Sequence, residues 1–497
     1  MAFSTAIPLR RRSSRAPAWW PLLLLAGCAA GPDYRPLTPE QLKVPAGFNA
    51  AAPAYASAVD LARWWQAFGD PTLSELVERG LRANLDIDQA GARVRQARAA
   101  LRASRSALFP TLDASGSVSR TVGRQGGSFI DSSGRLTTTQ GDQTRYQAGF
   151  DAAYEADLFG GTRRSIEAAR ADAQAREADL RSAQLSVASE IALNYLAARS
   201  AQNQLRVAAD DLRALDETVQ IVGWRVQAGL VGSLDLEQAR QLRAQTAAAI
   251  PNIESNYTAA VNRLAVLLGE APGAVTALLG GAVRDIPLAP AALSAAIPAD
   301  VIRRRPDVAT AERSLAAETA RIGVETAQLY PALRLTGSFG GSGLSLGDVV
   351  SSAIGNLVAG ITAPIFEGGR IRAAIEGQRA SADAALAGYR QSVLTALEDV
   401  ENALTALSAA ERREREILVA DEAARNAVLL ARSQYRAGLI DFQSLLESER
   451  SLLSSQQNRI TARADRATAT VQLYKALGGG WQAAPPPRSV TTSATRP

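Results

Sequence analysis

The stretch "LFPTLDASGSVS" at residues 108–119 returns in altered form as "LYPALRLTGSFG" at residues 329–340. Three further pairs of similar stretches follow in the same order along the chain. They are "DLFGGTRRS" (157–165) with "PIFEGGRIRA" (364–373), "VQAGLVGSLDLEQAR" (226–240) with "YRAGLIDFQSLLESE" (435–449), and "AVLLGEAPG" (265–273) with "KALGGGW" (475–481). The paired stretches lie roughly 207 to 221 residues apart, which indicates a tandem duplication, because two copies are too few for a solenoid.

Helices dominate the predicted structure of both halves. In each half a helix ends at an aromatic-to-proline step, Phe109–Pro110 or Tyr330–Pro331, because the residue before proline disfavours helical geometry. Residues 161–250 and 365–484 contain no proline and are rich in good helix formers. A helix from about Thr162 to Ala228 would be on the order of 100 Å long. The final helical stretch has a coiled-coil-like period of seven, with Leu446, Leu453, Ile460, Ala467 and Tyr474.

Four strand-like runs separate these helices. In the ranges 146–158 and 333–339 apolar and polar residues alternate, which is typical of strands with one apolar face. The run from Leu357 to Phe366 alternates less regularly, and 121–144 has the composition of an exposed loop. A soluble coiled-coil rod would explain the helices but not the strands. Four strands are too few for a membrane barrel, since single-chain barrels need at least about eight, so several copies must pool their strands.

The only cysteine, Cys28, follows a basic segment with Arg10, Arg11, Arg12 and Arg15 and a short apolar run. This pattern predicts a secretory signal peptide at residues 1–27. The run ends in Leu25-Ala26-Gly27-Cys28, which looks like a bacterial lipobox and implies that Cys28 is acylated. No aspartate follows the cysteine, so an outer-membrane address is expected. The alternatives are a buried free cysteine or a cysteine lost with a cleaved signal.

Composition excludes several function classes. The chain has no histidine and only two lysines, so it offers no Ser-His-Asp triad, His-ligated zinc site or P-loop. We therefore expect neither an enzyme nor a cofactor or metal, apart from lipid on Cys28. The net charge of +5 falls to about +1 without the four signal-peptide arginines, and the other charges alternate in sign. This pattern argues against a nucleic-acid partner.

Several further motifs occur in a specific order: "GPDYRP" after the lipobox, "WWQAFGDPTLSELVERGLRANLDI", "IRRRPDV" and the two "AGL" turns. Together they resemble the TolC-like outer-membrane factors, most closely the lipoprotein (OprM- and NodT-like) branch, over residues 28–482. The resemblance implies a mixed membrane α/β barrel: a homotrimer with a twelve-stranded outer-membrane β-barrel, continued by a long periplasmic α-helical barrel. It also implies a passive exit duct that receives drugs or other small toxic compounds from an inner-membrane RND transporter through a periplasmic adaptor.

The predicted organisation has five parts. They are a signal peptide (1–27), a lipid-anchored N-terminal segment (28–70), a first repeat (71–290), a second repeat (291–480) and a disordered tail (481–497). Within the same fold, the alternatives are a duct for type I protein secretion or for metal efflux. A periplasmic coiled-coil lipoprotein without a pore is a further alternative.

Two groups of residues are expected to matter for function. Tight helix reversals at the "AGL" motifs need the freedom of glycine, and the resemblance implies that these tips meet the adaptor: Gly229, Leu230, Gly438 and Leu439. The resemblance also implies a constriction near the second tip, where a family aspartate corresponds to Glu447. Its predicted residues are Glu447, Asp441, Leu446, Asp235 and Tyr435, with Tyr435 and Asp235 as latch partners. The alternative is that the acids are ordinary solvated positions at helix ends. Trp64, Trp65, Trp224 and Trp481 are expected to pack in an equatorial belt.

Overall fold

The computed structural model describes residues 29–48, 61–122, 128–130, 134–138, 142–281, 283–289 and 304–479. The predicted signal peptide, Cys28, Trp481 and the predicted tail lie outside the described residues. In the described part of the chain, no helix is both long enough and apolar enough to cross a membrane.

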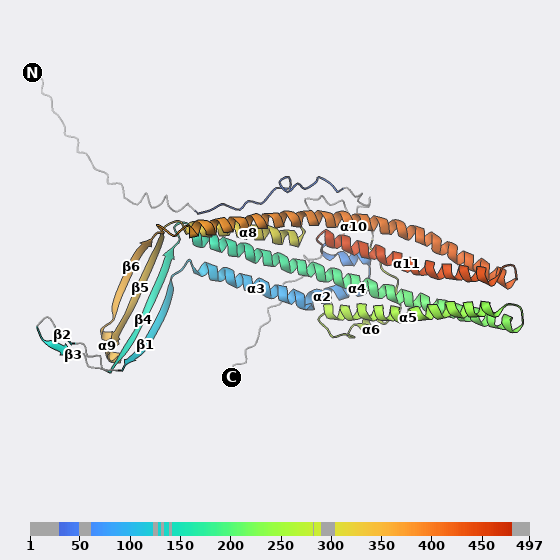
Figure 1. Ribbon diagram of the computed structural model, residues 1–497, viewed down its shortest axis with the longest axis horizontal. Coiled ribbons are helices and arrows are strands. Elements are labelled where there is room, and N and C mark those ends of the chain that lie inside the picture. Colours follow the sequence, from blue (N-terminus) through green and yellow to red (C-terminus); the bar gives the residue numbers. More distant parts are fainter. Residues whose placement is uncertain are drawn as a thin grey trace, which may run out of the picture. The chain divides into compact units, whose positions relative to one another are not determined.

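The duplication is visible in the lengths of the elements, which Figure 1 labels in chain order. Corresponding helices of the two repeats have equal lengths of 22, 67 and 35 residues. The first repeat contains α3 (Leu85–Ser106), β1 (Thr111–Thr121), β4 (Gln143–Ala156), α4 (Gly161–Gln227) and α5 (Ser233–Leu267). The second contains α8 (Pro306–Ala327), β5 (Ala332–Gly343), β6 (Ile354–Thr362), α10 (Arg370–Arg436) and α11 (Phe442–Ala476). The predicted long helix therefore agrees with α4 to within one residue at each end.

The described residues also contain smaller elements. They are η2 (Leu61–Phe68), α2 (Pro71–Ala83), β2 (Ser128–Ile130), β3 (Leu136–Thr138), α6 (Thr276–Leu279) and α9 (Leu346–Ser351). β2 and β3 pair with each other inside the segment predicted as a plain loop, so that prediction was incomplete. Short hairpins of this kind carry little periodic signal in a sequence.

Backbone and side-chain caps fix where the helices begin and end. Asp70 caps α2 by accepting a hydrogen bond from the backbone N–H of Thr72 at 2.9 Å, and Pro71 begins the helix. Both long helix pairs turn at a glycine of positive φ, Gly229 (74°) and Gly438 (75°). At each turn the leucine that follows this glycine donates its N–H to a carbonyl five residues earlier, at 2.9 Å. Only glycine adopts this conformation without strain, which explains the two "AGL" motifs.

The four long strands form one antiparallel sheet in the order β1-β4-β5-β6 (Figure 1). Their registers bring the apolar residues of all four strands onto one face, as the alternation predicted. This face carries Leu112, Val118, Tyr146, Phe150, Tyr154, Leu333, Leu335, Phe339, Leu357 and Ile361. The other face is polar and includes Asp113, Asp151, Glu155, Arg334, Ser338 and Asn356. Ile354 and Val358 lie on the polar face, which is why β6 alternates less regularly.

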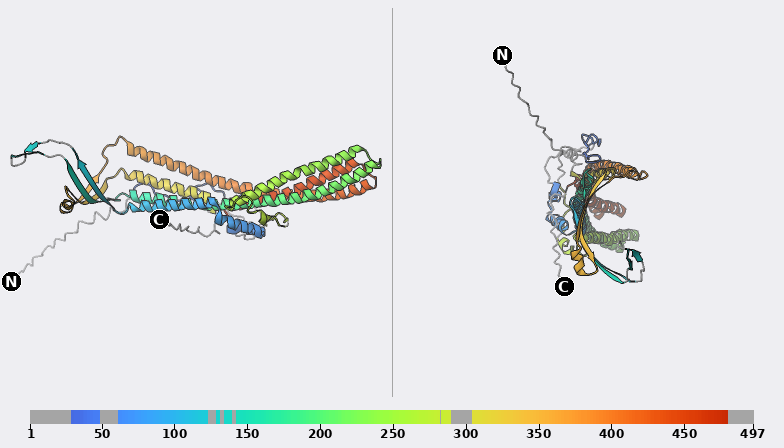
Figure 2. Two further views of the ribbon diagram at one scale, coloured as in Figure 1. Left: turned by 90° about the horizontal axis from the view of Figure 1, so that it is seen from below. Right: turned by 90° about the vertical axis from the view of Figure 1, so that its left-hand side faces the viewer.

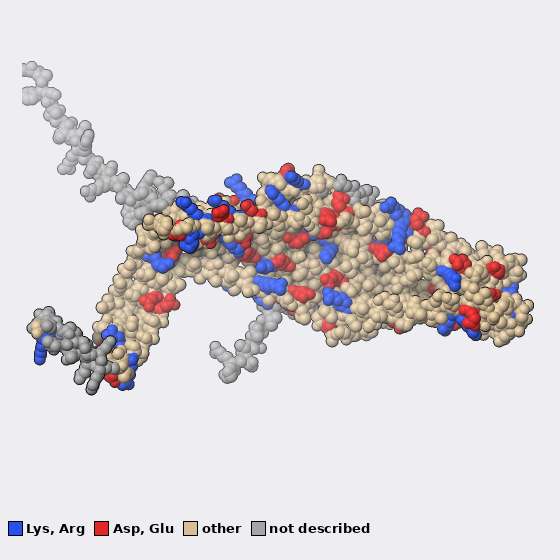
Figure 3. Space-filling model, viewed as in Figure 1, with Lys and Arg blue, Asp and Glu red and all other residues tan. Residues whose placement is uncertain are grey.

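The chain divides into two compact units, each of which draws on both repeats. One comprises Met1–Tyr34, Ala99–Ala171 and Ala316–Asp383 and holds the sheet; the other comprises Arg35–Arg98, Asp172–Leu315 and Ala384–Pro497. The predicted domain boundaries stay a prediction. On the face shown in Figure 3, acidic and basic side chains are interspersed over the helices, whereas the strands are mostly uncharged.

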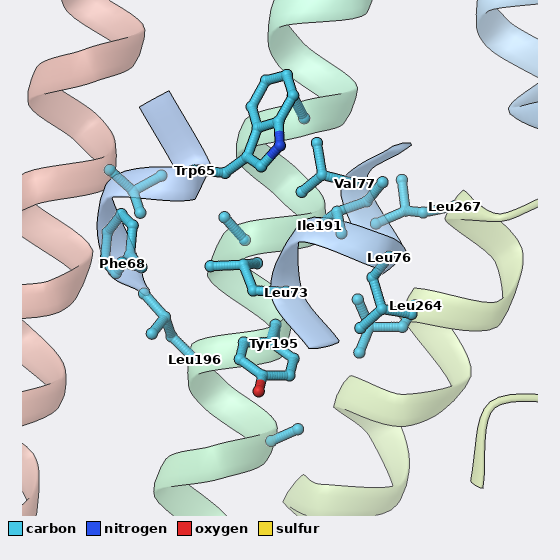
Figure 4. Close-up of a cluster of buried hydrophobic side chains, with 14 of the residues drawn as sticks. Trp65, Phe68, Leu73, Leu76, Val77, Ile191, Tyr195, Leu196, Leu264 and Leu267 are labelled. Atoms are coloured by element: carbon cyan, nitrogen blue, oxygen red, sulfur yellow. The ribbon is translucent and has the colours of Figure 1, made fainter. Parts of the chain in front are cut away.

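The main core of the helical unit gathers around η2 and α2, which pack against α4 and α5 (Figure 4). Trp64 is fully buried and stacks on Tyr474 with ring centroids 5.5 Å apart. The rings of Trp64 and Trp65 pack edge to face with centroids 5.9 Å apart. Tyr195 ties this core to the cap of α2, because its hydroxyl donates to Asp70 and accepts from Arg199 Nε at 2.9 Å. The predicted packing role of Trp64 and Trp65 is confirmed. For Trp224 it is wrong, because this side chain, near the end of α4, is 59% exposed.

The two tryptophan environments give a matched stability test. We expect Trp64→Ala to lower the free energy of unfolding by about 3–5 kcal/mol, because it empties a fully packed site. Trp224→Ala, its control, should change that free energy by less than about 0.5 kcal/mol. Circular dichroism of the helices during denaturant unfolding in detergent measures both. Equal losses in the two variants would contradict the assignment of the core.

Candidate functional site

The ends of the two long helix pairs, α4–α5 and α10–α11, lie side by side and share one apolar cluster (Figure 2). All four helices contribute to it, with Leu215 and Val222 from α4, Ala239 and Leu242 from α5, Ala431 and Tyr435 from α10, and Phe442, Leu445 and Leu446 from α11. Beyond this cluster, the turns expose Leu230 and Leu439 to solvent. The predicted tip residues are therefore at the surface, while their contact with an adaptor stays a prediction.

Leu446 does not fit its predicted place in a constriction. Its side chain is only 1% exposed because it packs inside the four-helix cluster, next to Leu445. A side chain buried within its own chain cannot line an opening. We therefore correct this prediction: Leu446 stabilises the hairpin ends.

Tyr435 is also buried, and its ring is covered by an arginine. The Arg225 guanidinium carbon lies 4.5 Å from the ring centroid, and Arg225 Nη1 donates to the Tyr435 carbonyl at 3.3 Å. Burial raises the pKa of Tyr435. Asp235 is half-buried in the first turn of α5, and its negative charge adds to the rise in the pKa of Tyr435. Among the described residues no hydrogen bond joins the two side chains. The latch between these two residues stays a prediction.

The two acids beyond the second tip differ in their surroundings. Asp441 caps α11, and its carboxylate accepts a hydrogen bond from the Ser444 N–H at 2.9 Å. Hydrogen bonding from Ser444 lowers the pKa of Asp441. Glu447 is exposed, one turn further along the same helix. Asp441 thus has a structural function of its own, whereas Glu447 is open to solvent and its predicted place in the constriction is not excluded by packing.

Sequence analysis missed the buried charges next to these acids. Glu449 is only 3% exposed and is paired with Arg432 at 3.2 Å, while the Thr218 hydroxyl donates to it at 3.3 Å. Burial raises the pKa of Glu449. The signal was present, since Phe442, Leu446 and Glu449 follow the spacing of one helix face. Because a buried ion pair is costly to break from one side, this contact fixes α11 against α10 and α4.

A second group of charges joins the same helices further from the tips. Asp421 is buried on α10 and paired with Arg425 at 3.0 Å and with Arg459 of α11 at 3.2 Å. Asp211 of α4 is partly buried beside Asp210, and burial raises its pKa to about 6. In the orientation that satisfies both groups, the Gln456 amide donates to both Asp211 oxygens, at 2.9 and 3.0 Å. Among the described residues, no group of three or more acidic, His or Cys side chains could hold a metal ion.

A sheet with one apolar face, joined in the same chain to two long helix pairs, defines a subunit of a membrane channel. The fold matches the solved outer-membrane channel OprN with a TM-score of 0.82 and 35% sequence identity, over 92% of this chain and 100% of that one. The chain is 33% identical to the pyoverdine export outer membrane protein OpmQ of Pseudomonas putida, covering 89% of this chain and 93% of OpmQ. It is also 33% identical to nodulation protein T of Rhizobium leguminosarum, covering 86% and 89%.

The sequence model of the outer membrane efflux protein family matches residues 76–270 and 297–479. The chain belongs to this family, and it is an outer-membrane efflux channel protein. The resemblance, the fold class, the efflux function and the outer-membrane location predicted from the sequence are thereby confirmed. Other relatives are named for the efflux of solvents, toluene and antibiotics.

The raised pKa of Asp211 predicts how stability depends on pH. Its folded-state pKa of about 6 exceeds the ordinary value of 3.8, so the folded state loses stability as the pH rises through 4 to 6. We expect Asp211→Asn to remove this loss and to raise stability at pH 7.5 by at most about 1 kcal/mol, because the Gln456 amide already stabilises the carboxylate in part, with no gain at pH 4. Thermal unfolding at both pH values measures the effect. Asp216→Asn, which alters an exposed carboxylate paired with Arg243, is the control and should show no pH-dependent gain.

Proposed function

We propose that the protein is the passive exit duct of a tripartite efflux system and acts as a homotrimer. The observation that carries this proposal is the sheet: it has one apolar face and two edge strands, β1 and β6, each with a single partner among the described strands. In hydrocarbon every backbone N–H and C=O needs a partner. Three copies that join β6 of one to β1 of the next supply them and give twelve strands around a polar lumen.

The exposed helix turns support the second part of the proposal, which concerns the other proteins of the efflux system. The exposed turns at Gly229–Leu230 and Gly438–Leu439 offer an apolar surface to a periplasmic adaptor, which links the duct to an inner-membrane RND transporter. The relatives' names refer to pyoverdine, solvents, toluene and antibiotics, so the proposed cargo is a range of small compounds. The proposed lumen face is rich in Ser, Thr and Gly, with a few charges of both signs such as Asp151 and Arg334, and therefore has little chemistry for choosing among these compounds.

The proposal includes a lipid on Cys28 as the only attached group, and it includes no catalysis. The apolar sheet face argues against a periplasmic scaffold without a pore, because such a surface would be exposed to water. Conductance of the detergent-extracted protein in planar bilayers tests the duct itself. Discrete channel steps from a trimeric species are expected, and folded protein that forms no channel would contradict the proposal.

Neighbouring residues on β6 test which sheet face meets lipid. Leu357 is on the apolar face and Asn356 on the polar face, in a row with Ser338, Asp151 and Asp113. We expect Leu357→Arg to destabilise the inserted protein by about 2–4 kcal/mol, as a cation on a lipid face near the midplane does. Asn356→Arg, the matched control, should insert normally. Urea resistance of the outer-membrane protein measures both, and the opposite ranking would reverse the assignment of the faces.

Glu447 tests the proposed constriction. In a trimer it is present three times around one axis, and such a carboxylate ring favours cations. Glu447→Ala should therefore lower the cation selectivity of single channels, whereas Glu447→Asp, which keeps the charge, should preserve it. Reversal potentials in a salt gradient measure the selectivity. Unchanged selectivity in Glu447→Ala would remove Glu447 from the constriction.

A further inference from the structure

Two sequence motifs that are far apart in the chain meet beside the end of a membrane strand. "GPDYRP" begins at Gly31 and "DLFGG" begins at Asp157, directly after β4. The Ala30 N–H donates to the Phe159 carbonyl at 2.9 Å. The residues that follow Cys28 are therefore attached to the short connection between β4 and α4.

Glycines allow this attachment to be close. Gly31 has a φ of 85°, and a Cβ built on it would lie 2.4 Å from Gly323 Cα. A Cβ on Gly323 of α8 would lie 2.6 Å from the Ala30 carbonyl oxygen and 2.7 Å from Arg164 Cγ. Any larger residue at either position would push the N-terminal segment away.

Arg164, in the first turn of α4, holds the segment with most of its donors. Its side chain is almost fully buried; Nε donates to the Ala30 carbonyl at 3.1 Å and Nη2 donates to the Gly31 carbonyl at 3.4 Å. Nη2 also pairs with Asp33 at 2.5 Å, and Nη1 pairs with Glu167 of its own helix at 2.7 Å. The planar guanidinium thus binds three successive parts of the segment at once. Tyr34 continues the contact by packing on a cluster of small residues, Ala171, Ala316 and Ala317.

The second repeat shows that this arrangement is not a general need of the fold. In α10 the position that corresponds to Arg164 is Ala373, because each donates its N–H to the carbonyl of the positive-φ glycine that precedes the helix, Gly160 or Gly369. The neighbouring Arg372 is exposed. A Cβ on Gly368 or Gly369 would meet nothing within 4 Å among the described residues, whereas one on Gly160 would lie 3.0 Å from Ala29 Cα. Of the two glycine-rich turns, only the one that begins α4 has the buried arginine and the close contact with the N-terminal segment.

We propose that Arg164, Gly31 and Gly323 form a clamp that positions the lipid anchor at the membrane boundary and thereby speeds assembly of the channel. The proposal rests on the proposed lipid on Cys28. Ala30 is two residues from Cys28, so the acylated residue lies within about 7 Å of a fixed point. The fixed point is the hydrogen bond between Ala30 and Phe159, and Phe159 is three residues beyond the end of β4. Acyl chains held there enter the bilayer next to the strands that must insert, at a high effective concentration.

A double-mutant cycle separates positioning of the lipid from ordinary stabilisation. Arg164→Ala is made in the full chain with its own signal, and again in a Cys28→Ala chain exported by a signal peptide that directs no lipidation. Pulse–chase labelling follows the protease-resistant form in the outer membrane. In the lipidated chain we expect Arg164→Ala to slow its appearance about tenfold, because the acyl chains lose part of their effective concentration beside the strands. In the unlipidated chain the same change should alter the rate by less than about twofold.

Two further variants make the test specific. Asp33→Ala removes one clamp contact without touching a helix, so it should give a smaller slowing of the same kind even if Arg164→Ala folds poorly. Arg372→Ala, which removes an exposed arginine from the first turn of α10, is the control and should have no effect in either chain. Circular dichroism checks that the purified variants keep their helix content.

The outcomes are distinct. Equal slowing by Arg164→Ala in both chains would make the clamp a purely structural contact and overturn the proposal. Normal assembly of both lipidated variants, Arg164→Ala and Asp33→Ala, would overturn it as well. Labelled palmitate on the wild-type chain is a separate readout: if none is incorporated, the lipid anchor itself fails, and the clamp's proposed role fails with it. Single-channel conductance of the wild type would still test, independently, the proposal that the protein is a duct.

Discussion

The outer backbone groups of β1 and β6 need hydrogen-bond partners, and within the described residues no strand of the chain pairs with these two edges. In water this would be a minor cost, but the sheet has a continuous apolar face that belongs in hydrocarbon, where each unpaired group costs several kcal/mol. The same strands cannot close on themselves, because four are too few to form a barrel. The duplication gives four strands per chain, and the need to pair the two free edges of this sheet is what calls for the proposed trimer.

The helical unit solves a different problem, which is to hold long helices together near a solvent-exposed end. An apolar cluster of nine buried residues joins all four helices at the tips. Charged contacts continue the packing, but they are buried on one side: Glu449 and Asp421 are almost fully buried, whereas their arginine partners are partly exposed. Such pairs add little net stability yet penalise misalignment strongly, because a shift leaves a buried charge without its partner. These pairs therefore set the register of α11 against α10 and contribute little to the stability of the packing.

Features that depend on one chain segment were predictable from the sequence. The limits of α4 follow from the glycines at 160 and 229 and from the helix-forming composition between them, and the sheet faces follow from period-two alternation, because these signals are local. Features that depend on what a helix face meets were not. Leu446 and Glu447 are adjacent, yet one is buried in the tip cluster and the other is exposed, and the sequence alone did not show which face turns inward. Trp224 was misplaced for the same reason, since tryptophan is usually buried but here lies near a tip.

The clamp at Arg164 shows how a duplicated chain acquires a difference between its halves. The two repeats began as equivalent glycine-rich turns, and both still place an arginine in the first turn of a 67-residue helix. Of these two turns, only the first lies against the N-terminal segment, and only there is an arginine of the turn buried and the glycine contact closed. A buried guanidinium is costly without acceptors, and here the N-terminal segment supplies three of them, two carbonyls and a carboxylate. The burial of Arg164 therefore depends on that segment. The contact with the N-terminal segment is what makes the first turn of α4 differ from the first turn of α10 in an otherwise duplicated fold.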